Sequence, residues 1–272
     1  MPPPLRPLRS WVLPYLFAAL SLLATACQPR PTLVPEPGRF VQRDLVQDGR
    51  DVRYLVFVPS AAHPRPLPVV LFLHGSGERG SDNQAQAAVG LGPWLRANAS
   101  RFPALVVFPQ AADDGEWAGA NARMALAALD AASAEFGGDP DRTYATGMSM
   151  GGYGTWELAL LEPGRFAALV PVCGGVLAPR TVRPSLHVTA VAGEADPHAA
   201  LVQRLAHVPA WMFHGARDEA VPPDDDRRLQ QLAGAAGADF RYTEYPEGGH
   251  NAWDAAYADP AMWAWLFAQR RR

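Results

Sequence analysis

Short, uninterrupted apolar runs alternate with helix-like segments from about Phe40 to the end of this 272-residue chain. Apolar side chains on both sides of a strand are typical of a parallel sheet that helices cover on both faces. The runs that carry this pattern are VRYLVFVP, LPVVLFLHG, ALVVFPQ, FAALVPVCGG and PAWMFHG. Strand and helix patterns in repeated order predict an α/β fold with a mostly parallel central sheet.

Helical patterns fill the segments between these runs. Residues 121–136 place apolar side chains at steps of three and four, so we expect a helix with Asn121 as its N-cap and Gly137 as its stop. A second helix, residues 150–161, is expected to end near Glu162 because a proline follows it. The first of these helices has one apolar face, as a helix that covers a sheet requires.

The C-terminal third of the chain adds further elements. Three aspartates begin a predicted helix at residues 224–237, and residues 239–246 have the composition of a strand. Asp259 and Pro260 are expected to begin a final helix. Residues 176–208 show neither pattern clearly, and we interpret them as an insertion over the top of the sheet.

The first 26 residues predict a signal peptide, because two arginines precede an apolar run that ends in small residues. Cys27 follows directly, and the segment resembles a bacterial lipoprotein signal, in which that cysteine is lipidated and anchors the protein to the cell envelope. An ordinary secretory peptide, which leaves a soluble secreted or periplasmic protein, is the alternative. Residues 27–39 are rich in proline and are expected to form a tether, with residues 40–272 as the folded domain.

The most specific motif is GMSMG, residues 147–151, which follows a predicted strand and precedes a predicted helix. In that context G-x-S-x-G forms a tight turn that raises the serine hydroxyl above the sheet. Gly147 and Gly151 are expected because side chains there would collide with the neighbouring strand and helix. Ser149 is therefore the candidate nucleophile, and the N–H of Met150 would point to where a carbonyl oxygen becomes negative. An inert serine in a glycine-rich turn is the alternative.

A serine hydroxyl needs a base, and two later segments supply the missing groups in the chain order Ser, Asp, His. Asp218 lies in the loop after the predicted strand PAWMFHG, and His250 lies in the loop after the next strand. Because the carboxyl ends of parallel strands open on the same side of a sheet, we expect both side chains to meet Ser149. His250 would act as base and then as acid, and Asp218 would orient it.

Rival side chains for these roles are present. Asp196 also follows a strand-like segment and is the main competitor for the acid, but Asp218 is separated from His250 by one helix and one strand, as this architecture expects. His74 and His214 precede glycine at strand ends, and we interpret them as structural.

The oxyanion formed during acyl transfer needs a second donor. The segment HGSGERG follows an early predicted strand, and in that place it resembles the loop that offers a backbone N–H to the oxyanion in serine hydrolases. Ser76 is the expected donor, with Gly77 next, although a plain glycine-rich turn is the alternative.

With these residues the chain resembles the α/β-hydrolase superfamily. Within it, the chain is similar to bacterial secreted esterases of the predicted-peptidase and phospholipase/carboxylesterase-like group, which are relatives of feruloyl and polyhydroxybutyrate-type esterases. The motifs that carry the resemblance are LFLHGSGERGSDN, DPDRTYATGMSMGGYGTWELAL, PAWMFHGARDEAVP and YTEYPEGGHNAWDAAY. The resemblance implies Ser149 as nucleophile, Asp218 as acid and His250 as base. The sequence shows no segment that would form a separate large cap domain.

We therefore expect a serine hydrolase that cleaves carboxylic esters through an acyl-enzyme, without metal or cofactor. A serine peptidase that acts on short peptides is the alternative, and a surface-binding protein that kept the scaffold is a third hypothesis. The expected partner is a small-molecule or polymer-derived ester, which an aromatic wall of Trp117, Trp156 and Trp253 could contact. A net charge of −3 and a pI near 6.2 argue against nucleic acid, and we expect a monomer that meets a membrane only through a lipid anchor.

Overall fold

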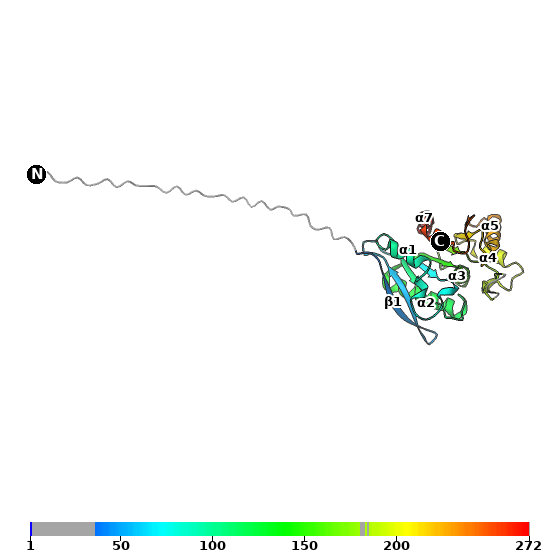
Figure 1. Ribbon diagram of the computed structural model, residues 1–272, viewed down its shortest axis with the longest axis horizontal. Coiled ribbons are helices and arrows are strands. Elements are labelled where there is room, and N and C mark those ends of the chain that lie inside the picture. The colour runs from blue at the N-terminus through cyan, green and yellow to red at the C-terminus, as the bar shows by residue number, and fades with distance from the viewer. Residues whose placement is uncertain (2–35, 180–182, 184, 272) are drawn as a thin grey trace. The chain divides into compact units, whose positions relative to one another are not determined.

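Eight strands form one mixed sheet in the computed structural model, which describes residues 1, 36–179, 183 and 185–271 (Figure 1). Their order across the sheet is β1-β2-β4-β3-β5-β6-β7-β8; β1 pairs antiparallel with β2 and β2 with β4, and all later pairs are parallel. The bounds are β1 Arg39–Gln47, β2 Arg50–Val58, β3 Leu67–Leu73, β4 Leu105–Phe108, β5 Gly138–Met148, β6 Ala168–Val172, β7 Ala210–Gly215 and β8 Phe240–Tyr245. The predicted α/β sheet is confirmed.

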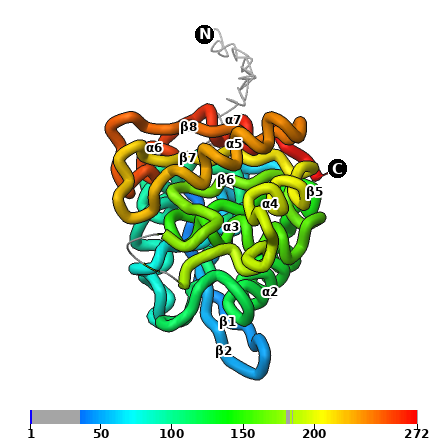
Figure 2. The backbone as a smooth tube through the Cα atoms, turned by 90° about the vertical axis from the view of Figure 1, so that its right-hand side faces the viewer, coloured from blue at the N-terminus to red at the C-terminus, as the bar shows by residue number. Residues whose placement is uncertain are grey.

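Helices cover both faces of the sheet. One face carries α2 (Gly119–Phe136), α3 (Met150–Leu161), α4 (Pro197–Leu205) and α5 (Asp224–Ala236), and α2, α3 and α4 lie toward the viewer in Figure 2. The other face carries α1 (Leu91–Asn98), α6 (Trp253–Ala258) and α7 (Pro260–Ala268). Each face has its own apolar core, so the sheet is a buried layer between two sets of helices.

Strand β3 shows how the continuous apolar runs serve this arrangement. Val69 and Leu71 point into the core beneath α2 and α3, whereas Val70 and Phe72 point into the opposite core. Side chains alternate between the two faces of a strand, so a strand that is buried on both faces needs apolar residues at every position. All seven residues of β3 are buried.

Most predicted helix ends agree with the structure, but one start does not. The α2 helix ends at Gly137, which adopts the left-handed conformation (φ 71°), and α3 has Glu162 as its C-cap, as expected. Asn121 is not the N-cap of α2, because the helix begins two residues earlier, after Ala118. The Asn121 amide instead donates to the carbonyl of Glu116 at 2.9 Å.

Residues 176–208 are only in part what the sequence interpretation expected. Their second half forms α4, which packs beside α3 and α5 on one face of the sheet and does not lie over its top. Asp196 is the N-cap of α4, since its carboxylate accepts from the N–H of Ala199 at 3.0 Å. A carboxylate in that position satisfies a free helix amide, so Asp196 is not the acid of the site.

The chain divides into two units, Met1–Val34 and Pro35–Arg272, and the sheet belongs to the second. The predicted signal peptide, Cys27 and the tether before residue 36 lie outside the described residues, apart from Met1, and stay predictions. Among the described helices, none is both long enough and apolar enough to span a bilayer. Within residues 36–271 as described, no separate cap domain accompanies the sheet.

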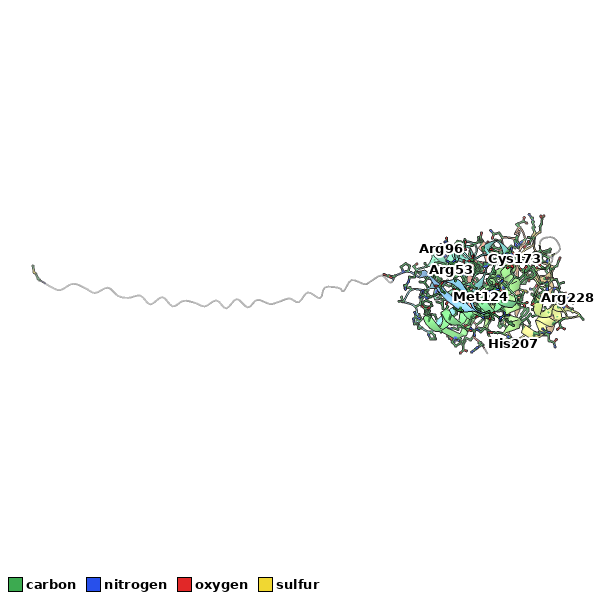
Figure 3. All side chains as sticks on the ribbon, turned by 90° about the horizontal axis from the view of Figure 1, so that it is seen from below. Arg53, Arg96, Met124, Cys173, His207 and Arg228 are labelled. Atoms are coloured by element: carbon green, nitrogen blue, oxygen red, sulfur yellow. The ribbon has the colours of Figure 1, made fainter. Side chains whose placement is uncertain are left out.

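The second cysteine of the sequence, Cys173, follows β6 and is fully buried. Figure 3 places it inside the domain, whereas His207 and Arg228 lie at the periphery. Burial raises the pKa of the Cys173 thiol. Because the thiolate is the reactive form of cysteine, Cys173 is an unreactive part of the core.

Candidate active site

The GMSMG segment forms a sharp turn between β5 and α3. Ser149 has φ 54° and ψ −119°, a conformation that a non-glycine residue rarely adopts. A Cβ at Gly147 would lie 2.3 Å from the carbonyl oxygen of Gly151, and a Cβ at Gly151 would lie 1.9 Å from that of Leu73. Both glycines are therefore required by the close approach of strand and helix, as the sequence predicted.

Three side chains from the loops after β5, β7 and β8 form one hydrogen-bonded chain. His250 Nε2 lies 2.9 Å from Ser149 Oγ, and His250 Nδ1 lies 2.7 Å from Asp218 Oδ2. A carboxylate can only accept, so Nδ1 carries a proton, and in a neutral imidazole this leaves Nε2 free to accept from the serine hydroxyl. The structure thus brings together the three residues that the sequence singled out.

Asp218 is held by more than the histidine. Its side chain has no exposed surface, and its Oδ1 accepts from the N–H groups of Ala220 and Val221, both at 2.9 Å. Burial by itself would raise the pKa of Asp218, but the hydrogen bonds from His214 and His250 and from the Val221 amide outweigh it and hold that pKa well below its usual range. Asp218 is therefore an anion fixed in one orientation.

A second, buried histidine lies behind Asp218. His214 Nδ1 is 2.8 Å from Asp226 Oδ2, and His214 Nε2 is 2.8 Å from the Val221 carbonyl and 3.3 Å from Asp218 Oδ2. The Val221 carbonyl can only accept, so Nε2 carries a proton that also faces Asp218.

The charges of His214 and Asp226 depend on each other. Burial opposes protonation of His214, but Asp218 and Asp226 outweigh it and raise the pKa of His214 to about 10. Burial raises the pKa of Asp226. His214 is therefore a buried structural residue, as the sequence analysis expected. It also contacts the Asp218 carboxylate. The available sequence signal was the spacing of four residues between His214 and Asp218.

His74, the other histidine interpreted as structural, is fully buried and satisfied. Its Nδ1 donates to the Gly75 carbonyl at 2.6 Å, and its Nε2 accepts from the N–H of Ala111 at 3.0 Å. Burial lowers the pKa of His74 to about 4. A neutral ring that uses both nitrogens for the backbone is not available as a base.

One of the two expected oxyanion donors, Met150, is part of the GMSMG turn, and the other, Ser76, lies in the segment after β3. Ser76 begins the short helix Ser76–Glu78 directly after the β3 loop, and a Cβ at Gly75 would lie 3.6 Å from the Cβ of Ser149. Met150 is the first residue of α3, where backbone N–H groups have no partner within the helix. The role of both N–H groups in binding an oxyanion stays a prediction.

Arg183 contacts both residues expected to form the oxyanion hole, and the sequence analysis did not anticipate it. Its Nη1 donates to Ser76 Oγ at 2.7 Å and lies 3.7 Å from Met150 Sδ. Its Nε lies 2.8 Å from Glu116 Oε1. Arg183 comes from the segment that showed no regular pattern, so no periodicity or motif could have placed it here.

The expected aromatic wall is wrong for two of its three members. Trp117 is 2% exposed and donates from Nε1 to the His74 carbonyl, and Trp156 has no exposed surface and stacks in the core. Neither ring can present a face to a substrate from these positions. Trp253 is half-buried and meets His250 edge-on, with ring centroids 5.5 Å apart, so a substrate contact there stays a prediction.

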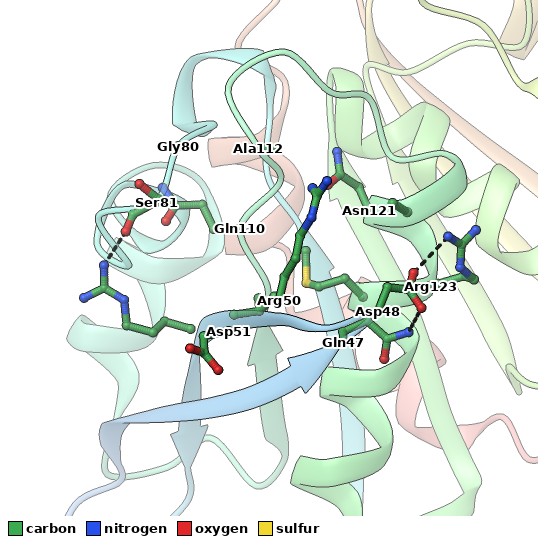
Figure 4. Close-up of a pocket in the computed structure, with 14 residues that line it drawn as sticks. Gln47, Asp48, Arg50, Asp51, Gly80, Ser81, Gln110, Ala112, Asn121 and Arg123 are labelled. Atoms are coloured by element: carbon green, nitrogen blue, oxygen red, sulfur yellow. Dashed lines mark hydrogen bonds and ion pairs between the residues drawn. The ribbon is translucent and has the colours of Figure 1, made fainter.

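A cavity of about 490 Å³ lies elsewhere, beside the turn that joins β1 and β2 (Figure 4). Charged and amide side chains from this turn and from the start of α2 line it, and none of Ser149, Asp218 and His250 is among them. Arg123 and Asp48 form an ion pair of 2.9 Å at its edge. The candidate site is therefore located by the chemistry of its side chains and not by cavity size.

No group of three or more His, Cys, Asp or Glu side chains within the described residues is arranged to hold a metal ion. The arrangement that is present contains a serine hydroxyl, an imidazole and a carboxylate in hydrogen-bond contact, which are the groups that acyl transfer by a serine requires.

Known proteins with similar sequences and structures include several hydrolases. The sequence model of the prolyl oligopeptidase family (Peptidase_S9) matches residues 109–269, more than half of the chain. "Putative esterase NocK" of Nocardia uniformis subsp. tsuyamanensis is 33% identical over 168 residues, which are 57% of this chain and 48% of that protein. "Uncharacterized secreted protein" of Arthroderma benhamiae is 30% identical over 207 residues, which are 69% of this chain and 21% of that protein.

A solved structure of a thermostable esterase matches with a TM-score of 0.68 and 29% identity, over 85% of this chain and 63% of the other. The chain spans about half of one curated relative and about a fifth of the other. The resemblance to esterases of the α/β-hydrolase superfamily is thus confirmed.

Proposed function

The chain belongs to the prolyl oligopeptidase family, and on this premise we propose that it is a serine hydrolase that cleaves carboxylic esters through an acyl-enzyme. The observation that carries the proposal is the unbroken chain of hydrogen bonds from Ser149 Oγ through His250 to Asp218. A hydroxyl in contact with an unprotonated imidazole nitrogen is the arrangement that converts serine into a nucleophile.

The geometry supports a two-step reaction. In the first step His250 Nε2 takes the hydroxyl proton while Ser149 Oγ attacks the ester carbonyl, and the carbonyl oxygen becomes an oxyanion near the N–H groups of Ser76 and Met150. The tetrahedral intermediate collapses when His250 gives the proton to the leaving alcohol. In the second step His250 takes a proton from water as the water oxygen attacks the acyl carbon. The bond between that carbon and Ser149 Oγ then breaks as His250 returns the proton to Oγ, which releases the carboxylic acid and free Ser149.

The choice of esters over peptides is supported by the names of two similar proteins, the esterase of Nocardia uniformis subsp. tsuyamanensis and the thermostable esterase. A peptidase that acts on short peptides is the second candidate, because the family description itself is that of an oligopeptidase. The same nucleophile and base can cleave both esters and amides, so the residues that bind the substrate determine which of the two is cleaved.

We propose export for the same protein. Support comes from the leader-like first 26 residues and from the similar Arthroderma benhamiae protein, which is described as secreted. Lipidation at Cys27 is the more specific form of this proposal, and incorporation of labelled palmitate into the wild type but not into a Cys27→Ser variant would support it.

The test of function compares the wild type with Ser149→Ala on p-nitrophenyl acetate and butyrate, and on feruloyl esters and short peptides. We expect ester turnover by the wild type and a fall in kcat of at least about 10⁴-fold in the variant. A fluorophosphonate probe should label the wild type alone. Equal turnover by the two proteins would contradict the proposal, and turnover of peptides alone would establish the second candidate.

A further inference from the structure

Arg183 is held in place from both sides of its segment. Before it, the N–H groups of Val176 and Leu177 donate to the Asp225 carboxylate at 2.7 and 2.8 Å. After it, the N–H of Val188 donates to the Val176 carbonyl at 2.9 Å, which closes the segment into a loop. Val176 and Val188 are buried, so residues on both sides of Arg183 belong to the packed part of the domain.

The Arg183 side chain joins three separate parts of the site. One nitrogen contacts Ser76 Oγ and Met150 Sδ, and another pairs with Glu116, on the loop that follows β4. Arg183 and Glu116 are only 20% and 22% exposed. Charges that are largely removed from solvent act on their surroundings with less screening than surface charges do.

The contact with Ser76 has a defined direction. An arginine side chain is always charged and can only donate, so Ser76 Oγ accepts this hydrogen bond at 2.7 Å. Glu116 uses one carboxylate oxygen for Arg183; the other is buried and has no hydrogen-bond partner among the described residues. The negative charge of Glu116 thus neutralises the positive charge of Arg183.

We propose that Arg183 is a positioning residue of the oxyanion hole, which fixes the Ser76 turn and places a positive charge beside the carbonyl oxygen as it becomes negative. Glu116 is its counter-ion in the resting site. The inference rests on the proposed function, because it concerns the same acyl-transfer reaction. A fixed positive charge near a developing oxyanion favours the transition state over the bound substrate, so its effect belongs to kcat and not to KM.

The experiment measures kcat and KM for p-nitrophenyl butyrate, a neutral ester, in four variants. For Arg183→Met we expect kcat to fall about 10- to 100-fold with KM within about threefold of the wild type, less than the loss of a direct oxyanion donor. Arg183→Lys keeps the charge and should recover most of that loss. Glu116→Gln keeps an acceptor for Arg183 and removes the opposing charge, so its kcat should equal or exceed that of the wild type.

Arg228→Met is the matched control, since Arg228 is an exposed arginine of α5 with an ion pair of 3.3 Å to Asp196. It should leave both constants unchanged. Thermal unfolding of each variant separates lost activity from lost folding.

Two results would overturn the inference. Unchanged kcat in Arg183→Met, or a change confined to KM, would make Arg183 a substrate contact or a bystander. Equal losses of kcat in Arg183→Met and Glu116→Gln would make the ion pair a structural link without an electrostatic role. Either result, together with an active wild type and an inactive Ser149→Ala variant, would leave the proposed function intact.

Discussion

Residues 147–151 form the nucleophile turn, named after the candidate nucleophile Ser149, and the loop after β7 is the acid loop, named after the candidate acid Asp218. The two contribute to the same hydrogen-bonded chain by different physical means. The turn is shaped by backbone contacts, because Gly147 and Gly151 leave no room for a side chain. The acid loop is shaped by buried polar groups, because Asp218 is fixed by two backbone amides and two histidines. The first kind of constraint is local in sequence, and the second joins residues from several elements. The two regions should therefore fail differently when they are altered.

The largest effect is expected at the nucleophile turn. A methyl group at Gly151 would lie 1.9 Å from the Leu73 carbonyl oxygen, so Gly151→Ala must separate α3 from β3. We expect little folded protein, with a loss of stability above about 4 kcal/mol, at the extreme end of single substitutions. Expression yield and thermal unfolding would measure it.

Gly164→Ala is the matched control, because a Cβ there meets nothing within 4 Å. A Gly151→Ala protein as stable as this control would show that the turn is not sterically constrained.

Alteration of the acid loop should remove activity before it removes the fold. Asp218→Asn has nearly the same shape but lacks the charge that orients His250 and stabilises its protonated form. We expect kcat to fall by about 10⁴-fold, with a much smaller change in KM. Steady-state kinetics and a thermal melt of the same sample would test this. If the Asp218→Asn protein is unfolded, and no folded but inactive form is found, the two regions do not differ in the way proposed.

The smallest effect is expected from the group behind the acid, and it should depend on pH. His214 has its pKa raised from 6.5 to about 10, so its contribution to stability is complete below pH 6.5 and is lost as pH rises toward 10. The unfolding free energy of the wild type should therefore decrease between pH 7 and pH 10 more steeply than that of His214→Asn.

Denaturant titrations at pH 6, 8 and 10 would give these free energies. Parallel curves for the two proteins would show that His214 is not charged in the folded state. We also expect His214→Asn to lower kcat much less than Asp218→Asn does. This result would indicate that His214 stabilises Asp218 and takes no direct part in proton transfer.

The predictions from the sequence were correct where the constraint is local in the chain and failed where it joins distant residues. The Ser149 turn, the strand ends that carry Asp218 and His250, and the glycine stop of α2 all depend on local sterics or on chain order, and they agree with the structure. Asn121 failed as an N-cap because the chain enters α2 two residues earlier, where no side-chain cap is used. Local propensity does not reveal how a preceding loop approaches a helix.

Long-range contacts account for the remaining errors. Trp156 lies on α3, directly after the nucleophile turn, yet its ring points into the core against Phe240 of a distant strand. Arg183 is 107 residues from Ser76 in the sequence and contacts it directly. Nothing in the neighbourhood of either residue distinguishes a core side chain from one at the site, because the deciding partner lies elsewhere in the chain.

The position of β6 has a consequence for how such a protein can diversify. β6 lies between β5 and β7, which are followed by Ser149 and by the loop that holds Asp218, but contributes no side chain to the Ser149–His250–Asp218 chain. The segment that leaves β6 nevertheless contacts Ser76, in the loop after β3, through Arg183. A substitution in this segment can therefore change the surroundings of Ser76 while Ser149, His250 and Asp218 keep their places after the neighbouring strands.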